Sequence, residues 1–229
     1  MNNLFIAILA IVSTISLYLL SVKIHRHRNL PFTQPIILTS GIIILFLLLF
    51  NIPYETYMLG GKWIDFLMGP AVVALAFPLY NHFEMLKRLA GPIIIGTTVG
   101  AVIGVSSGVL LAKWLGFEKE FILALVPKSV TTPVAISIVE TLEGPISLAA
   151  IFVVIAGVSG VLMNPLIFKV FRLNTAIGRG VGIGSASHAM GTASAMGRSN
   201  LEASMSTIAM VLSAVIVSAI APFIVILLL

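Results

Sequence analysis

Long apolar runs, each about as long as a bilayer is thick, make up most of this 229-residue chain. A helix of roughly 20 residues crosses a hydrocarbon core of about 30 Å, and lipid offers no partner to an exposed backbone group. The sequence therefore predicts membrane-spanning helices. About six full spans are expected, over residues 4–22, 32–52, 64–81, 92–114, 145–168 and 204–229.

Composition supports the same class. Hydrophobic residues make up 59% of the chain and charged residues 9%, and the mean hydropathy is +1.15, far above what a soluble domain hides in a core. We predict an all-α polytopic protein with a single membrane domain over residues 1–229. Within it, residues 1–118 would form scaffold-like spans and residues 119–229 a bundle of broken helices.

Two polar segments interrupt the apolar sequence in the second half of the chain. They are Pro-Lys-Ser-Val-Thr-Thr-Pro at 127–133 and Gly-Ile-Gly-Ser-Ala-Ser-His-Ala-Met-Gly-Thr at 182–192. Non-helical chain at membrane depth is tolerated only where it is buried in protein or lines a wet cavity. Two such breaks predict an internal site for a small polar solute, with helix ends aimed at it.

The first break offers hydroxyls and one cation between two prolines that stop the helix. Pro127 and Pro133 would shape the turn, and the candidate binding residues are Lys128, Ser129, Thr131 and Thr132. Hydroxyls and helix N-termini suit a carboxylate, and Lys128 could pair with a monoanion. The alternatives are that Lys128 snorkels at an aqueous mouth and that each hydroxyl bonds its own helix backbone.

The second break combines hydroxyls, glycines and a histidine. We expect Gly182, Gly184 and Gly191 to permit a tight, exposed backbone turn. The candidate binding residues are Ser185, Ser187, His188 and Thr192. His188 could carry a proton, or it could bond a facing carbonyl as a structural tie. Asn164 could add an amide to the same cavity, and Pro165 after it could instead only kink its helix.

Basic residues indicate the orientation. Lys23, Arg26 and the pair Lys87-Arg88 are cytoplasmic if the N-terminus lies outside. Lys169 then becomes cytoplasmic only if the first broken element, over 121–142, enters and leaves on the outer side. The second, over 175–197, would enter and leave from the cytoplasm, making residues 121–171 and 175–229 inverted repeats. In the rival topology each element crosses fully as two half-helices.

Glycines recur every fourth residue along one face of the span at 92–114. They are Gly96, Gly100, Gly104 and Gly108. A ridge of this kind lets another helix approach closely. We expect a packing seam or a surface along which the neighbouring elements move.

Three motifs in order resemble the LrgB/CidB family of bacterial membrane proteins. They are the two polar breaks and the segment Gly-Pro-Ala-Val-Val-Ala-Leu-Ala-Phe-Pro-Leu-Tyr at 69–80, and the resemblance runs nearly end to end. It implies action with a small LrgA/CidA-like membrane partner, in the cell membrane of a bacterium. It also implies one of two functions, control of murein hydrolase activity and lysis, or transport of small monocarboxylates such as pyruvate or glycolate.

The broken helices favour transport, because a solute site requires them and a scaffold does not. The sequence thus predicts a carrier for small monocarboxylates, with proton coupling as an open option and an antiholin-like regulator as the alternative. A homo-oligomer is expected. No cofactor, metal site, nucleic-acid partner or enzymatic activity is predicted, since the chain has no cysteine and no nucleophile and base at recognisable spacing.

Overall fold

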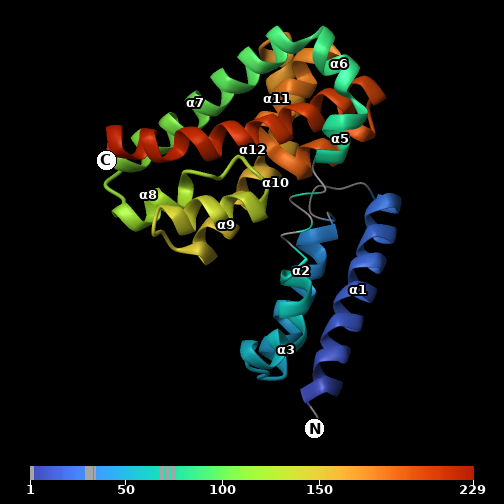
Figure 1. The fold of residues 1–229 in the computed structure, drawn as a ribbon. Helices are drawn as coiled ribbons and strands as arrows, with labels where there is room; N and C mark the ends of the chain where they lie inside the picture. The colour runs from blue at the N-terminus through green and yellow to red at the C-terminus, as the bar shows by residue number, and fades with distance from the viewer. Residues whose placement is uncertain (1–2, 29–32, 34, 68–69, 71–72, 74–75) are drawn as a thin grey trace. The chain divides into compact units, whose positions relative to one another are not determined.

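A computed structural model describes residues 3–28, 33, 35–67, 70, 73 and 76–229, and every regular element in that part of the chain is helical. The helices form two compact units, Met1–Ala71 and Val72–Leu229. Figure 1 shows the helices of each unit. The all-α class predicted from the apolar runs is confirmed. Four helices are long and apolar enough to cross a membrane, and a shorter apolar helix lies in the N-terminal unit.

The N-terminal unit contains α1 (Asn3–Arg28), α2 (Pro35–Leu49) and α3 (Tyr54–Asp65). Both later helices pack on α1. The Thr39 hydroxyl of α2 donates to that of Ser21 at 3.0 Å, while the Thr14 and Tyr57 hydroxyls join α1 to α3 at 3.1 Å. Gly60 sits so close to α1 that an added methyl would lie 2.8 Å from the Ala10 Cβ. Small residues and hydroxyl pairs therefore hold this unit together.

The C-terminal unit begins with two short helices, α5 (Ala76–Asn81) and α6 (Phe83–Arg88). The span predicted over 64–81 includes residues 68, 69, 71, 72, 74 and 75, which lie outside the described residues. On either side of them, α3 ends at Asp65 and α5 begins at Ala76.

Six further helices complete the described part of the C-terminal unit. They are α7 (Ala90–Trp114), α8 (Lys119–Leu125), α9 (Thr132–Thr141), α10 (Ile146–Val170), α11 (Ala176–Met196) and α12 (Asn200–Leu228), with the first break between α8 and α9. α7 and α12 run side by side in the same direction, because Ile93 packs with Ile208 near their starts and Val109 with Ala221 nearer their ends. The Lys113 ammonium of α7 caps the end of α12 by donating to the Leu228 carbonyl at 2.6 Å.

The first broken element folds back on itself. Ala124 at the end of α8 shares a buried cluster with Val139 near the end of α9. A methyl at Gly144, just after α9, would come 3.1 Å from the Leu123 Cβ. A straight pair of half-helices would hold these residues more than 20 Å apart at 1.5 Å per residue. α8, the break and α9 therefore form a hairpin, which we call the first hairpin.

The second broken element also reverses. α11 is helical except at His188, where φ is 40° and ψ is −138°. Ile183 before this point and Ala195 after it belong to one buried cluster, although 12 residues of straight helix would separate them by about 18 Å. α11 is therefore a second hairpin, with a first arm over 176–187 and a second arm over 189–196. The hairpin topology, and not the crossing one, describes both elements.

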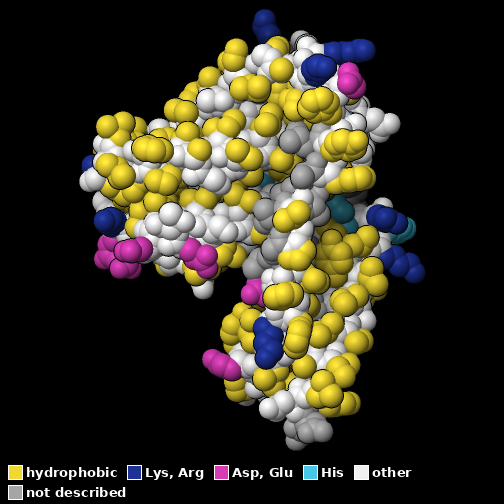
Figure 2. All heavy atoms as spheres, in the orientation of Figure 1, with side chains coloured by type: hydrophobic (Ala, Val, Ile, Leu, Met, Phe, Trp, Pro, Cys, Tyr) yellow, Lys and Arg dark blue, Asp and Glu magenta, His cyan; other side chains and the backbone are white. Residues whose placement is uncertain are grey.

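Apolar side chains cover the outside of the C-terminal unit, as Figure 2 shows. Trp114, Ile226 and Leu227 are each more than 80% exposed. A large exposed apolar surface of this kind is expected where a protein meets lipid. In the same view the charged side chains lie in small groups at the margins of the apolar surface.

The helix α7 lies in the same compact unit as the two broken helices. The physical reason is the glycine ridge of α7, whose lack of side chains allows both hairpins to pack directly against its backbone.

Candidate functional site

The two hairpins approach α7 from opposite ends. The second hairpin starts beside the beginning of α7, where Val181 packs with Ile93, and its Ser185 faces Gly100. The first hairpin starts beside the end of α7, where Ile122 joins the cluster of Ala112. Both hairpins run inward from these ends, so their tips converge on the middle of α7.

The glycine ridge is the surface that receives them. A methyl added at Gly100 would lie 3.2 Å from the Ser185 hydroxyl, and one added at Gly104 would lie 3.7 Å from the Ser129 hydroxyl. Gly100 and Gly104 are one helical turn apart, about 6 Å along the axis. The two polar breaks, 56 residues apart in the sequence at these positions, therefore meet on neighbouring steps of one helix.

Lys128 lies at this meeting point. Its Nζ donates to the Gly104 carbonyl at 2.7 Å, and it passes so close to Gly108 that a methyl there would lie 2.6 Å away. The side chain thus packs along the α7 ridge and does not snorkel outward. An ammonium has three donors, and no acidic residue in the described part of the chain forms an ion pair with this one.

The residues after Lys128 lead into a helix start. Thr131 is the N-cap of α9 and is 92% buried, yet its hydroxyl caps nothing and has no hydrogen-bond partner in the structure. Thr132 and Pro133 form the first turn, and Pro133 has no N–H of its own. Pro127 begins the turn, with the Val130 N–H donating to its carbonyl at 3.1 Å. The N-terminus of α9 therefore presents a hydroxyl and backbone donors that remain open to a ligand.

His188 forms the tip of the second hairpin. It is 97% buried, and its Nε2–H donates to the Val153 carbonyl of α10 at 2.9 Å. A non-glycine residue with φ of 40° and ψ of −138° is strained, so the packing around it must hold it in place. His188 is thus a structural tie between α11 and α10, the second of the two roles that the sequence left open.

The hydroxyls of the second hairpin divide into two groups. Ser185 donates to the Val181 carbonyl at 2.7 Å, and Thr192 donates to the His188 carbonyl at 2.9 Å and meets the Ser206 hydroxyl at 2.8 Å. These two are satisfied within the protein. Ser187 is fully buried against α10, and its hydroxyl has no partner. A methyl at Gly160 of α10 would overlap it.

The glycines of the second break do not make its turn. Gly182 and Gly184 lie in the helical first arm, and Gly191 lies in the second arm, with none of them at positive φ. The expected glycine turn is therefore corrected to a turn at His188. Gly184 instead lets α11 touch the α12 backbone, since a Cβ there would overlap the Ser206 carbonyl oxygen, and Gly191 packs on Ile183 across the hairpin.

Several buried polar atoms lack hydrogen-bond partners in this unit. They lie on α7, α9, α10, α11 and α12 or at the start of one of these helices. The atoms are the hydroxyls of Thr97, Thr131, Ser187 and Ser213 and the Asn164 Nδ2. A buried donor left without a partner costs about 1–3 kcal/mol. Such a group is explained by water or by a polar ligand in the interior.

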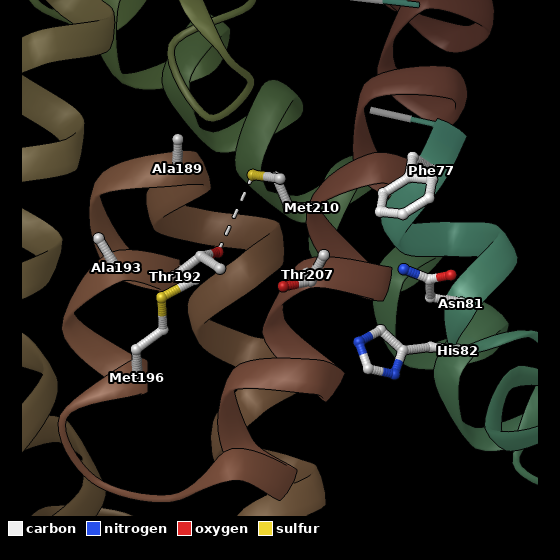
Figure 3. A pocket seen from close by; sticks show the side chains of 9 residues that line it. All are labelled: Phe77, Asn81, His82, Ala189, Thr192, Ala193, Met196, Thr207 and Met210. Carbon is white, nitrogen blue, oxygen red and sulfur yellow. Dashed lines mark hydrogen bonds between the residues drawn. The ribbon is translucent and has the colours of Figure 1, made fainter. Parts of the chain in front are cut away.

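A cavity of about 410 Å³ opens beside the second arm of α11. Figure 3 shows its lining, in which Asn81 and His82 face Thr207 and Thr192 across the space. Of the predicted site residues only Thr192 lines it. Sequence reasoning missed Asn81, His82 and Thr207. The one available signal was the polar pair Asn81-His82 directly after the 69–80 motif.

A buried carboxylate closes the open end of the second hairpin. Glu202 of α12 is fully buried and accepts from Arg179 of the first arm at 2.9 Å and from Arg198, just after the second arm, at 2.6 Å. Both guanidinium groups also lie within 6 Å of the Phe168 ring centroid. The two ends of the hairpin are thereby fastened to one point of α12.

Comparison with known proteins shows to which family the chain belongs. Residues 14–227 match the LrgB-like family. The chain belongs to this family. It is 43% identical over 225 residues to Uncharacterized protein YxaC of Bacillus subtilis, with 98% of both chains covered. It is 33% identical over 227 residues to Holin-like protein CidB of Staphylococcus aureus, with 99% of both chains covered. No solved structure matches it.

Membership of the LrgB-like family confirms the resemblance inferred from the three motifs. Together with the apolar helices, it establishes a multi-pass membrane protein of a family that includes holin-like members. The match extends over both compact units, so it includes the broken helices as well as the first helices.

Proposed function

We propose that this LrgB-like protein is a carrier for small monocarboxylates, such as pyruvate or glycolate, in the cell membrane of a bacterium. The anion would bind where the two hairpin tips meet on α7. Opposed hairpins that bring helix ends and unwound chain to the middle of a membrane domain are a recurring way to build a solute site.

The single observation that supports this most is the state of Lys128. A cation in the interior of a membrane protein is costly unless a counter-charge or water accompanies it. Lys128 contacts one backbone carbonyl, and the described residues supply no acid to pair with it. A carboxylate solute would supply the missing charge, with Ser129, Thr131 and Thr132 and the start of α9 as further donors.

The roles of the other candidate residues follow from their hydrogen bonds. Ser187 retains a free hydroxyl for the solute, while Ser185 and Thr192 shape the wall of the site. His188 holds the second tip in place. We therefore assign control of charge to Lys128, and proton coupling would act through this residue.

Charge also supports an orientation. Lys87, Arg88, Lys169, Arg172, Arg179 and Arg198 belong to the end where α7 and α12 begin. Glu118, Glu120, Glu140 and Glu143 belong to the opposite end, with Lys113 and Lys119 as its basic residues. By the positive-inside rule the first end is cytoplasmic. Applied separately to α1, the same rule favours a cytoplasmic location for Lys23 and Arg26 and an N-terminus outside.

The test is uptake of labelled pyruvate or glycolate into proteoliposomes, with and without a small LrgA/CidA-like partner. We expect uptake by the wild type and a loss of at least about tenfold in Lys128→Gln, as for one charge-assisted hydrogen bond. Thr132→Ala should also lower uptake. The matched control is Lys113→Gln, since Lys113 likewise donates to a carbonyl but at the helix ends. A silent wild type in both conditions, or equal uptake in the Lys128 and Lys113 variants, would defeat the proposal.

The second candidate function is regulation of murein hydrolase activity. The 33% identity to Holin-like protein CidB favours it, as do the internally satisfied hydroxyls of Ser185 and Thr192. In that case the hairpins would be packing devices. Lys128→Gln would then leave hydrolase activity and lysis in whole cells unchanged, whereas a carrier would show parallel losses of uptake and of any effect on lysis.

A further inference from the structure

We propose that the 410 Å³ cavity beside α11 is the aqueous compartment through which the solute reaches the hairpin tips from the basic end of the protein, and that Asn81 and His82 form a subsite there for its carboxylate. This inference rests on the proposed function for the identity of the ligand. The existence of the compartment does not depend on it.

The direction of the cavity follows from its lining. Ala189, Thr192, Ala193 and Met196 lie on one face of the second arm, at steps of three and four residues. Ala189 is next to the tip residue His188, and Met196 is the last residue of α11, next to the open end held by Glu202. The cavity thus follows the whole arm from the open end to the tip.

The opposite wall supplies the polar groups. It consists of Phe77, Asn81 and His82 from α5 and the residue after it, and Figure 3 shows the Asn81 amide and the His82 ring on the side of the cavity that faces Thr207. Neither the Asn81 nor the His82 side chain makes a hydrogen bond within the described residues, so both keep donors for a ligand, whereas the Thr207 hydroxyl already donates to the Ala203 carbonyl at 2.9 Å. The rest of the lining is largely apolar, as in most small-molecule pockets.

The cavity is large enough for a small solute that keeps part of its hydration shell. At about 30 Å³ per water, 410 Å³ holds on the order of ten water molecules. A small carboxylate could therefore enter with part of its hydration shell. The loss of the remaining water would occur at the tips, where Lys128 supplies the counter-charge.

The natural absence of cysteine makes this directly testable. Single-cysteine variants at Ala189 and Ala193 would be labelled with a charged, membrane-impermeant methanethiosulfonate from each side of membrane vesicles. Two controls lack water access for different reasons. Ala195→Cys lies on the same arm but is fully buried, and Ala219→Cys lies on the exposed apolar stripe of α12 with Val215 and Phe223.

We expect Ala189→Cys and Ala193→Cys to react at least about tenfold faster than both controls, because only a hydrated thiol forms the reactive thiolate readily. Reaction should be faster from the side where Lys87 and Arg88 lie. Pyruvate or glycolate should slow it, and His82→Gln should raise the concentration needed for this protection without changing the unprotected rate.

Two results would overturn the inference in separate ways. Labelling at 189 and 193 no faster than at 195 and 219 would exclude the aqueous compartment, whatever uptake shows. Fast labelling with protection that His82→Gln and Asn81→Ala leave unchanged would exclude the subsite. Fast labelling without any protection, in a protein that takes up no monocarboxylate, would instead refute the proposed function and leave the compartment standing.

Discussion

The two hairpins differ in how their polar groups are satisfied. In the second hairpin, His188 bonds Val153, Thr192 bonds Ser206, and Glu202 fastens both ends. In the first hairpin, Lys128 has one carbonyl partner and Thr131 has none. At the start of its first arm, the rings of Phe117 and Phe121 stack with their centroids 4.2 Å apart. Most polar groups of the second hairpin thus serve structure, with the Ser187 hydroxyl as the exception, whereas Lys128 and Thr131 of the first remain available for binding.

This comparison teaches that a polar break in a membrane helix is not by itself a binding site. A polar side chain in the break is available to a ligand only where the surrounding helices do not already satisfy its hydrogen-bonding groups. We therefore expect substitutions in the second hairpin to lower the stability of the fold, and substitutions at the tip of the first to lower function with little change in stability. Four predictions test this contrast.

The largest effect on stability is expected for Gly184→Ala. The new methyl would overlap the Ser206 carbonyl and force α11 away from α12, which should cost about 3 kcal/mol. The measurement is thermal unfolding in detergent. Gly182→Ala is the matched control, since nothing lies within 4 Å of a Cβ there, and it should be neutral or stabilise by about 0.5–1 kcal/mol. Equal shifts for the two variants would contradict the packing assigned to Gly184.

A smaller loss is expected for Glu202→Gln. The amide keeps the shape of the carboxylate but removes the charge that both Arg179 and Arg198 contact, so about 2 kcal/mol should be lost. Partial exposure of the two arginines limits the cost, because water can solvate them. Glu84→Gln, an exposed acid without an ion pair among the described residues, should not change the melting temperature. A similar shift in both variants would mean that Glu202 does not fasten the hairpin.

His188 allows strain and hydrogen bonding to be separated. His188→Ala loses the bond to Val153 and keeps the strained backbone, whereas His188→Gly loses the bond but relaxes the strain. We expect the glycine variant to be more stable than the alanine variant by about 1 kcal/mol. Denaturant or thermal unfolding of the two proteins side by side measures the difference. An alanine variant as stable as the wild type would show that the tie contributes nothing.

The smallest change in stability is expected for Lys128→Met. The loss of one hydrogen bond, about 1 kcal/mol, is offset by removal of a poorly compensated interior charge. The melting temperature should therefore stay close to that of the wild type while uptake is lost. A collapse in stability comparable to that of Gly184→Ala would make Lys128 a structural residue and remove the contrast between the hairpins.

Much of the fold could be predicted from local sequence. The apolar runs indicated the long helices α1, α7, α10 and α12, and the prolines at 127 and 133 marked the first break to within a few residues. The charge pattern left hairpins and crossings as alternatives, and the packing of Ile183 with Ala195 shows a hairpin for the second element. These features could be predicted from local sequence because the bilayer sets the length of a span, the places where a helix stops and the placement of charges.

The candidate site was predictable only in part. Lys128 and Thr131 could be named from the break, but His82 and Asn81 could not, because nothing in the sequence says that α5 lies across from α11. The glycine turn was misplaced for a related reason. Gly184 is required by a close approach to α12, and that contact exists only in the folded protein.

The amino-acid sequence by itself determined that this chain is an all-helical membrane protein with two polar breaks and a charge bias between its ends. Only the tertiary structure decided which polar groups remain free. Hydrogen-bonding capacity belongs to each residue, so the sequence displays it. Satisfaction of that capacity depends on partners such as Gly104 for Lys128 and Val153 for His188, which lie 24 and 35 residues away and are brought near only by helix packing.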